Sequence, residues 1–209
     1  MVCNPPKNSK THDCGPCPKI EPKPDENTTP TLSDLIESYK SEHLKRLENL
    51  LMPFETITDC VCGAVGNIDA PHPGTFIRNG SHQYCMPVAT INQVVPLLKN
   101  VNSKKFNDFD KLYDFVDSIS KGVEDFGDLA KYDFSLRYGF RRGLRPEKYV
   151  YTHRGARIGA EALVKAGFLN EVNHKIDIND FPAQLRELGA MHLENFLCIQ
   201  KEYLKLLKK

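Results

Sequence analysis

The sequence predicts a mainly α-helical protein: a single helical domain over residues 31–209, with a small irregular or β-hairpin element, preceded by a disordered tail over residues 1–30. Apolar residues recur every three to four positions in several segments, which is the spacing of one helix face. Patterns that alternate apolar and polar residues are short. The composition, 40% hydrophobic and 26% charged over 209 residues, is that of a globular protein.

The expected disorder of residues 1–30 follows from their composition. Half of the chain's fourteen prolines fall in this stretch, and Ile20 is its only large aliphatic residue after the start. Such a segment buries too little apolar surface to offset the entropy lost on ordering.

The first predicted helix covers about residues 32–51. Thr31 or Ser33 can cap its start, because a hydroxyl oxygen accepts a hydrogen bond from the free N–H groups of the first turn. Pro53 ends the helix, since proline has no N–H to donate.

Residues 54–86 are rich in glycine and proline and predict loops, with a short β-hairpin near residues 75–86. Residues 88–99 return to a helical pattern, which Pro96 must kink or end. A further helix covers about residues 109–119.

The start and end of the 109–119 helix have recognisable signals. Asn107 or Asp108 caps its start, and Gly122 follows its end.

The helix predicted over residues 127–142 has a clear end. Gly143 suits the left-handed conformation that follows many helices, and Leu144 can fold back onto the last turn. Pro146 prevents the helix from continuing. An extended link then follows.

This link covers residues 148–151, and Thr152 is expected to cap a helix that runs to about Ala166, with Gly167 as its terminator.

The C-terminal part is also predicted to be helical. Asp180 caps a short helical segment over residues 181–188, Gly189 interrupts it, and a last helix covers about residues 191–207. No run of about 18 apolar residues is present, and the first ten residues lack the apolar core of a secretory signal. We therefore expect a cytoplasmic protein with no membrane partner.

The strongest functional signal is a cluster of arginines. Six of the chain's nine arginines lie between Arg137 and Arg157, and this window carries +6 on a protein of net charge +1. Arginine suits planar, bidentate binding of phosphate and carboxylate groups. The expected ligand-binding residues are Arg137, Arg141, Arg145, Arg154, Arg157 and His82. The alternative is a solvated basic surface near a helix C-terminus, where cations are favoured.

Two residues are candidates for acid–base catalysis. Asp133 lies four residues before Arg137, so it is either a carboxylate positioned for proton transfer or one half of an i,i+4 ion pair. His153 lies beside Arg154 at a predicted helix start, where free N–H groups favour an anion. The small residues of that helix, Gly155 among them, allow close approach of a ligand or of another helix.

The seven cysteines predict free thiols rather than disulfides in a reducing compartment. Cys14-Gly-Pro-Cys17 matches a redox dithiol motif, but no strand precedes it. A zinc site is an alternative, with ligands of suitable type in Cys3, His12, Cys14 and Cys17, or in Cys60, Cys62 and Cys85 with His72 or His82. We expect neither, and thus no metal and no cofactor.

The pattern GDLAKYDFSLRYG…RPEKYVYTHRGARIGAEAL resembles a family of mostly bacterial hypothetical proteins over about residues 75–200. The resemblance includes residues 81–84, Tyr132-Asp133 and His153–Gly155, and it implies organisation but no mechanism.

Residues 139–163 also resemble a helix-hairpin-helix DNA-binding domain, in which backbone N–H groups at a Gly-rich turn meet DNA phosphates. The usual hydrophobic-Gly-hydrophobic-Gly turn is missing here. A glycosylase of that type would need a catalytic aspartate, for which Asp177 or Asp180 is a candidate.

The sequence therefore favours an anion-binding helical protein, with nucleic acid ahead of a nucleotide as its ligand. An enzyme acting on a phosphorylated or nucleic-acid substrate is one alternative, with Asp133 or His153 as acid or base and the arginines as clamp. An interaction protein whose arginines pair with carboxylates is another. The pI of the chain, about 7.6, favours a local basic patch over a wholly basic surface.

Overall fold

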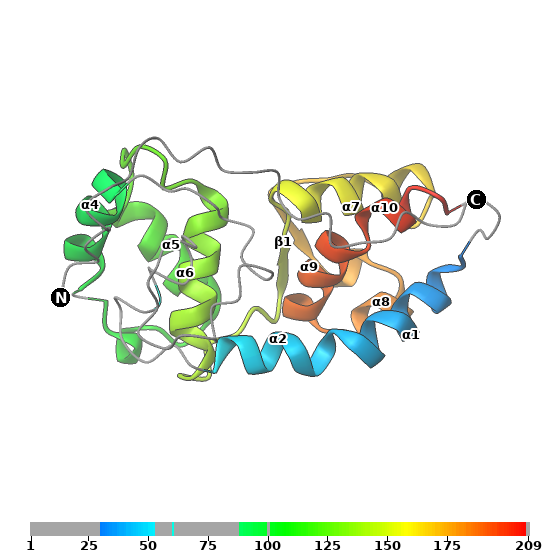
Figure 1. Ribbon diagram of the computed structural model, residues 1–209, viewed down its shortest axis with the longest axis horizontal. Coiled ribbons are helices and arrows are strands. Elements are labelled where there is room, and N and C mark those ends of the chain that lie inside the picture. The colour runs from blue at the N-terminus through cyan, green and yellow to red at the C-terminus, as the bar shows by residue number, and fades with distance from the viewer. Residues whose placement is uncertain (1–29, 53–59, 61–87, 100, 208–209) are drawn as a thin grey trace, which may run out of the picture. The chain divides into compact units, whose positions relative to one another are not determined.

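The computed structural model describes residues 30–52, 60, 88–99 and 101–207. Over these residues the chain is mainly helical, as the sequence predicts, and two short strands pair in an antiparallel sheet (Figure 1). The predicted tail and the predicted loops and hairpin of residues 54–86 lie outside the described residues, as does His82.

The chain divides into two compact units. Among the described residues, the first consists of residues 50–52, 60, 88–99 and 101–144, and the second of residues 30–49 and 145–207. The single domain expected over residues 31–209 stays a prediction, and each unit is described by itself.

The first unit is built from α4 (Val88–Leu98), α5 (Phe109–Ile119) and α6 (Asp128–Phe140), with a 3-10 turn, η1, at Ser103–Lys105. Asp108 caps α5 by accepting a 2.8 Å hydrogen bond from the Lys111 N–H, as one of the two expected caps. The core of this unit consists of Cys60, Val94, Leu98, Val101, Leu112, Val116, Phe126, Ala130, Phe134, Tyr138 and Leu144.

Pro96 does not end α4, which continues to Leu98. Proline removes one backbone donor, but the N–H of Lys99 still bonds the carbonyl of Val95 at 3.1 Å.

The end of α6 confirms the predicted glycine signal. Gly143 has φ 73°, and the N–H of Leu144 bonds the carbonyl of Gly139 at 3.0 Å. Leu144 is buried in the core of the unit, so this turn fixes where α6 ends and where the link to β1 begins.

The second unit begins with α1 (Leu32–Glu42), which continues into α2 (Leu44–Leu51), whose last two residues belong to the first unit. Thr31 and Asp34 form a capping box at the start of α1, which confirms the predicted Thr31 cap. The single helix predicted over residues 32–51 is interrupted at His43, where φ is −113° rather than about −63°.

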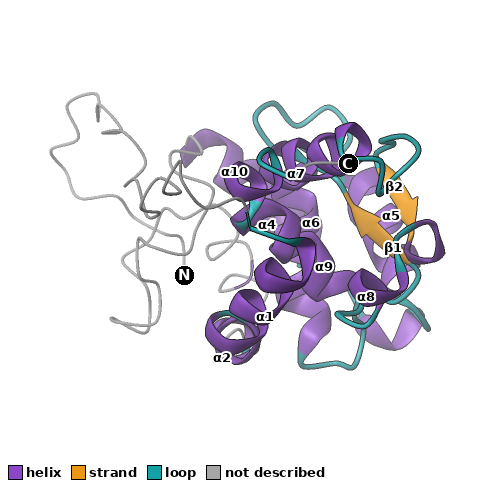
Figure 2. Cartoon of the chain, turned by 90° about the vertical axis from the view of Figure 1, so that its right-hand side faces the viewer, coloured by secondary structure: helices purple, strands orange, loops and turns teal. Residues whose placement is uncertain are grey.

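The rest of the second unit alternates short elements in the order β1 (Tyr149–Tyr151), α7 (Arg154–Lys165), β2 (Lys175–Asp177), η2 (Ile178–Asp180), α8 (Ala183–Arg186), α9 (Ala190–Ile199) and α10 (Lys201–Leu204). The two strands lie side by side in Figure 2, with Val150 opposite Ile176. The extended link over residues 148–151 is thus confirmed as a strand, whose partner the sequence did not predict.

Two predicted caps and one helix are corrected. Thr152 does not cap α7, because its hydroxyl donates to the carbonyl of Asn173, and His153 is the cap residue. Asp180 ends η2 instead of capping a helix, and Asp177 caps η2. The predicted last helix is two helices, since Gln200 lies between α9 and α10.

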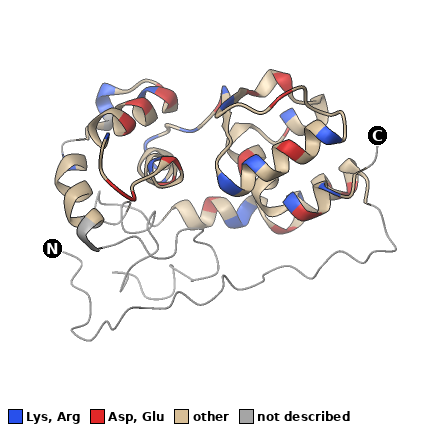
Figure 3. Cartoon of the chain, turned by 90° about the horizontal axis from the view of Figure 1, so that it is seen from above, with Lys and Arg blue, Asp and Glu red and all other residues tan. Residues whose placement is uncertain are grey.

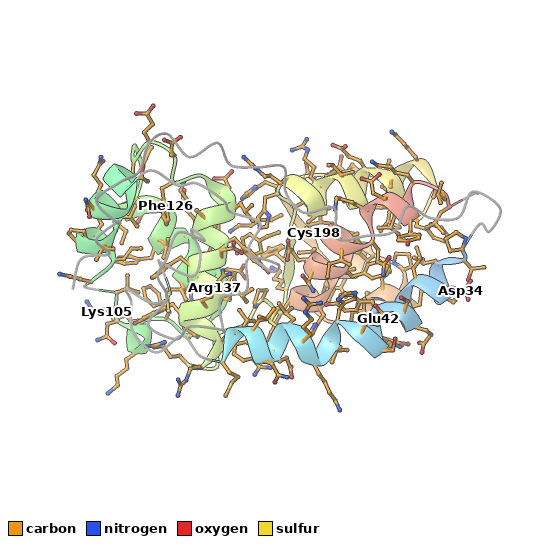
Figure 4. All side chains as sticks on the ribbon, viewed as in Figure 1. Asp34, Glu42, Lys105, Phe126, Arg137 and Cys198 are labelled. Carbon is orange, nitrogen blue, oxygen red and sulfur yellow. The ribbon has the colours of Figure 1, made fainter. Side chains whose placement is uncertain are left out.

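Helices α7 and α9 pack against each other with their backbones close together (Figure 1). A Cβ atom added at Gly159 would lie 2.2 Å from the carbonyl oxygen of Leu197, and one at Gly155 would lie 2.5 Å from Cys198 Sγ. Figure 4 shows Cys198 on α9. The small residues of α7 therefore serve helix packing, which is the alternative that the sequence left open.

The core of the second unit is assembled from α1, β1, α7, β2, α8, α9 and α10. Its buried residues are Leu32, Leu35, Ile36, Tyr39, Val150, Ala156, Ala160, Ala162, Leu163, Leu169, Ile176, Phe181, Leu185, Leu188, Ala190, Leu193, Phe196, Leu197, Cys198 and Leu204. None of the helices in the described ranges is both long enough and apolar enough to cross a membrane.

Candidate functional site

The arginine window is divided between the two units. Arg137, Arg141 and Arg142 belong to the first unit, and Arg145, Arg154 and Arg157 to the second. Lys and Arg residues are interspersed with Asp and Glu residues on several helices (Figure 3). The partners of each arginine are therefore described one by one. A site built from Arg137, Arg141, His153 and Arg154 is not contained in one unit, and it stays a prediction.

The arginines of α6 contact their own helix. Arg137 lies on α6 (Figure 4). Its Nη1 donates to the carbonyl of Asp133 at 3.1 Å and lies 3.5 Å from Asp133 Oδ1. Both side chains are only about one seventh exposed, at 13% and 14%. Asp133 thus has the i,i+4 ion pair that was the alternative to a catalytic role.

The two arginines after α6 differ from Arg137. Arg142 Nη1 donates to the carbonyl of Tyr138 at 2.6 Å, and its guanidinium lies 4.0 Å from the centre of the Tyr138 ring. It therefore helps to end the helix. Arg141 is the C-cap residue and is exposed.

Two arginines of the second unit pair with carboxylates. Arg145 Nη1 lies 3.8 Å from Glu48 Oε1, and Arg157 Nε donates to Glu161 Oε1 at 3.1 Å. All four side chains are exposed by two fifths or more, so water screens both pairs.

Arg154, the first residue of α7, differs from the other arginines of the window. It is exposed, its φ is 38°, and it forms no ion pair with any residue that the structure describes. Positive φ is uncommon for a residue other than glycine. The first turn of α7 contains no acidic residue, and the cap residue makes no side-chain hydrogen bond there. The positive end of the helix and a guanidinium thus lie together at the surface.

His153, the cap residue of α7, is buried beside a carboxylate. Its imidazole Nδ1 lies 3.8 Å from Glu194 Oε1, and each residue is 8% exposed. A carboxylate next to an imidazole nitrogen can hold that ring in one tautomer and stabilise its protonated form. The predicted acid–base candidate His153 therefore has a potential orienting partner on α9.

A second imidazole of α9 joins a hydrogen-bonded group that the sequence analysis did not identify. His192 Nδ1 lies 3.1 Å from the hydroxyl of Tyr39, which also accepts a 3.0 Å hydrogen bond from Asn195 Nδ2. His192 Nε2 lies 3.7 Å from Glu48 Oε1. The sequence signal was the polar pair His192 and Glu194 within the apolar stretch of α9, where polar side chains need buried partners.

Burial shifts the pKa values of this group. It raises the pKa of the Tyr39 hydroxyl far above its usual range, because the phenolate would be desolvated. It lowers the pKa of His192, and the nearby Glu48 carboxylate opposes that shift only in part. Burial also lowers the pKa of His43. The two imidazoles thus favour their neutral forms.

Among the residues that the structure describes, no three His, Cys, Asp or Glu side chains are grouped so that they could hold a metal ion. Cys60 and Cys198 lie in the apolar cores. The other five cysteines, His12, His72 and His82 lie outside the described residues, so the alternatives named for them are not tested.

Comparison with protein-family models, with curated proteins and with solved structures gives no match to this chain. The resemblances to a bacterial family and to helix-hairpin-helix domains stay predictions.

Proposed function

We propose that the second unit binds a phosphate-bearing ligand at the start of α7, with nucleic acid ahead of a mononucleotide. The observation that carries this proposal is Arg154, an exposed guanidinium at a helix start that forms no ion pair within the described part of the chain.

The physical argument joins three features of this helix start. Backbone N–H groups and the helix dipole favour an anion there. Arg154 supplies donors that fit two oxygens of one phosphate group. Its positive φ is a conformational cost, and such costs persist where the surrounding structure fixes the backbone, often at binding sites.

Further cations of the same unit support a polyanion over a single phosphate. Lys148, just before β1, lies 4.6 Å from the ring centre of Tyr149, and Lys175 of β2 lies 5.1 Å from the ring centre of Tyr151. The net charge of +1 makes a local patch the appropriate expectation, and a cytoplasmic location, expected from the sequence, would expose the protein to nucleic acids.

The test is a fluorescence titration of duplex DNA, single-stranded DNA, single-stranded RNA and ATP with the full chain at two salt concentrations. We expect a nucleic acid to bind, with affinity that falls steeply as salt rises, because phosphate neutralisation releases counterions. Arg154→Ala should weaken binding about tenfold or more, since a hydrogen bond to a charged group contributes about 1.5–3 kcal/mol.

Two variants serve as controls. Arg154→Lys keeps the charge but not the planar pair of donors, so it should retain only part of the affinity. Arg186→Ala removes an exposed arginine from α8 of the same unit and should leave affinity unchanged. Equal loss in Arg186→Ala and Arg154→Ala would show a nonspecific charge effect. Absence of binding by all four ligands would overturn the proposal.

Acid–base catalysis on such a ligand is a second candidate function. His153, which directly precedes Arg154 in the sequence, forms a buried pair with Glu194 of α9. A carboxylate that orients an imidazole is a common arrangement for proton transfer, and an adjacent arginine can stabilise developing negative charge. In this alternative His153 is the acid or base, and Glu194 positions it.

This alternative is tested by incubating the protein with p-nitrophenyl phosphate and with labelled DNA and RNA. Turnover that is lost in His153→Gln, reduced in Glu194→Gln and kept in His174→Gln would support it. Equal turnover in wild type and His153→Gln, or none in any, would exclude His153 as a catalyst of these reactions.

A further inference from the structure

Tyr39 of α1 is fully buried against α9, between two imidazole rings. Its ring stacks on His43 at 5.7 Å and meets the edges of His192 and Phe196 at 6.2 and 5.7 Å. Tyr39 and His192 are 153 positions apart in the sequence, so this contact fastens the N-terminal helix of the unit to its C-terminal part.

The hydrogen bonds around the Tyr39 hydroxyl specify the protonation state of His192. Asn195 donates to the Tyr39 oxygen, which leaves the Tyr39 proton free to be donated to His192 Nδ1. The neutral imidazole then carries its own proton on Nε2, directed toward Glu48 at 3.7 Å. In this arrangement the Asn195 amide, the Tyr39 hydroxyl and the His192 Nε2–H each point toward an acceptor.

A proton taken up from solvent has to bind at Nδ1, so Nδ1 becomes a donor. The Tyr39 oxygen must then accept from both Asn195 and His192, and its own proton must turn toward another acceptor in a site from which water is excluded. A buried polar group that loses its partner is costly. Protonation therefore weakens the contact of α1 with α9.

Several charged and titratable groups surround the contact between Tyr39 and His192. Glu42 adjoins His43 at the end of α1, and Arg46 and Glu48 lie on α2. Arg145 precedes β1, and Glu194 lies on α9. Glu48 attracts a protonated His192, but it is 41% exposed and is shared with Arg145, which repels that proton.

We propose that the docking of α1 on α9 is a pH-sensitive latch, in which proton uptake by His192 reverses its hydrogen bond with Tyr39 and loosens α1. This device is independent of phosphate binding at the start of α7. The pKa of His192 is lowered in the folded protein, so the unfolded or undocked chain binds the extra proton more readily. The contact is fully stable above the ordinary pKa of about 6.5 and weakens as pH falls below it.

The test is hydrogen exchange of the full chain, followed by mass spectrometry at about pH 7.5 and about pH 5, with correction for the intrinsic exchange rate. Peptides of α1 should lose protection at the lower pH by severalfold more than peptides of α7 in the same unit. His192→Gln offers an acceptor to Tyr39 and a donor to Glu48 without titrating, so the extra loss in α1 should shrink.

His174→Gln is the matched control, because His174 is exposed and its ring packs edge-on against Tyr151 of β1. It should behave as wild type. The proposal would be overturned if α1 and α7 lost protection equally at the lower pH, or if the extra loss in α1 were undiminished in His192→Gln. If that variant does not fold, NMR titration of His192 in the wild-type protein decides: an apparent pKa at or above 6.5 overturns the proposal, and a lower value supports it.

Discussion

Helices α6 and α7 flank the same arginine-rich stretch, yet they use their arginines in different ways. Within α6, Arg137 pairs with Asp133, and Arg142, just after the helix, bonds the carbonyl of Tyr138. On α7, Arg157 pairs with Glu161 in water, and Arg154 forms no ion pair with a described residue.

The different packing of the two helices accounts for this contrast. Helix α6 buries aromatic rings, and Arg137, the arginine within this helix, is only 13% exposed. Helix α7 presents small residues to α9, so the backbones approach closely and its long side chains remain exposed. A high density of arginine in the sequence therefore does not by itself define a site, because local partners occupy some of the arginines.

The largest loss of stability is expected for a substitution that disrupts the close packing of α7 on α9. In Gly159→Ala the new methyl group would lie 2.2 Å from the carbonyl oxygen of Leu197, so α7 and α9 must separate. We expect the free energy of unfolding to fall by about 3 kcal/mol, the upper part of the usual range for overpacking. Urea denaturation followed by circular dichroism measures it.

Gly127→Ala is the matched control for that substitution. Nothing lies within 4 Å of a Cβ atom at Gly127, which precedes α6 with φ −77°. A loss of at most about 1 kcal/mol is expected, because glycine is preferred over alanine at a helix N-cap. Similar losses in both variants would mean that the α7–α9 contact is not specially tight.

The next effect concerns the ion pair of α6. Asp133→Asn removes the carboxylate charge beside Arg137, whose side chain is 13% exposed and also donates to the Asp133 carbonyl. We expect a loss of about 1.5 kcal/mol in unfolding free energy. A double-mutant cycle with Arg137→Gln isolates the pair, and a coupling near zero would contradict a structural role for Asp133.

A smaller effect of opposite sign is expected at Arg154. Glycine adopts φ 38° without steric cost, although it loses more backbone entropy on folding. Arg154→Gly should therefore raise the unfolding free energy by about 0.5 kcal/mol while it weakens phosphate binding. Thermal unfolding compares it with Arg154→Ala, which keeps the strained backbone. A loss of stability in the glycine variant alone would show that the backbone there is unstrained.

The smallest effect is expected for the exposed pair of α7. Glu161→Gln removes the partner of Arg157, and both side chains are about half exposed. An exposed i,i+4 pair contributes about 0.3–0.5 kcal/mol, and less at high salt. Denaturation should show this loss of unfolding free energy at low salt and not at high salt. A value as large as that of Asp133→Asn would remove the contrast between the two helices.

The sequence predicted those features that depend on neighbouring residues. Thr31, Asp108 and Gly143 each act within a single helix end, where a side-chain oxygen or a left-handed glycine satisfies backbone groups a few residues away. The helical periodicity also predicted the mainly α class. Asp133 with Arg137 was foreseen as a pair because residues four apart share a helix face.

The tertiary structure alone decided the features that join distant parts of the chain. The strand partner of residues 149–151, the hydroxyl of Thr152 on Asn173, and the pairing of Tyr39 with His192 depend on contacts from 21 to 153 positions apart. No local pattern encodes these contacts, since burial and partner geometry arise only when the elements pack. For the same reason the sequence predicted five arginines as ligand-binding residues, and packing distinguished Arg154 from Arg137.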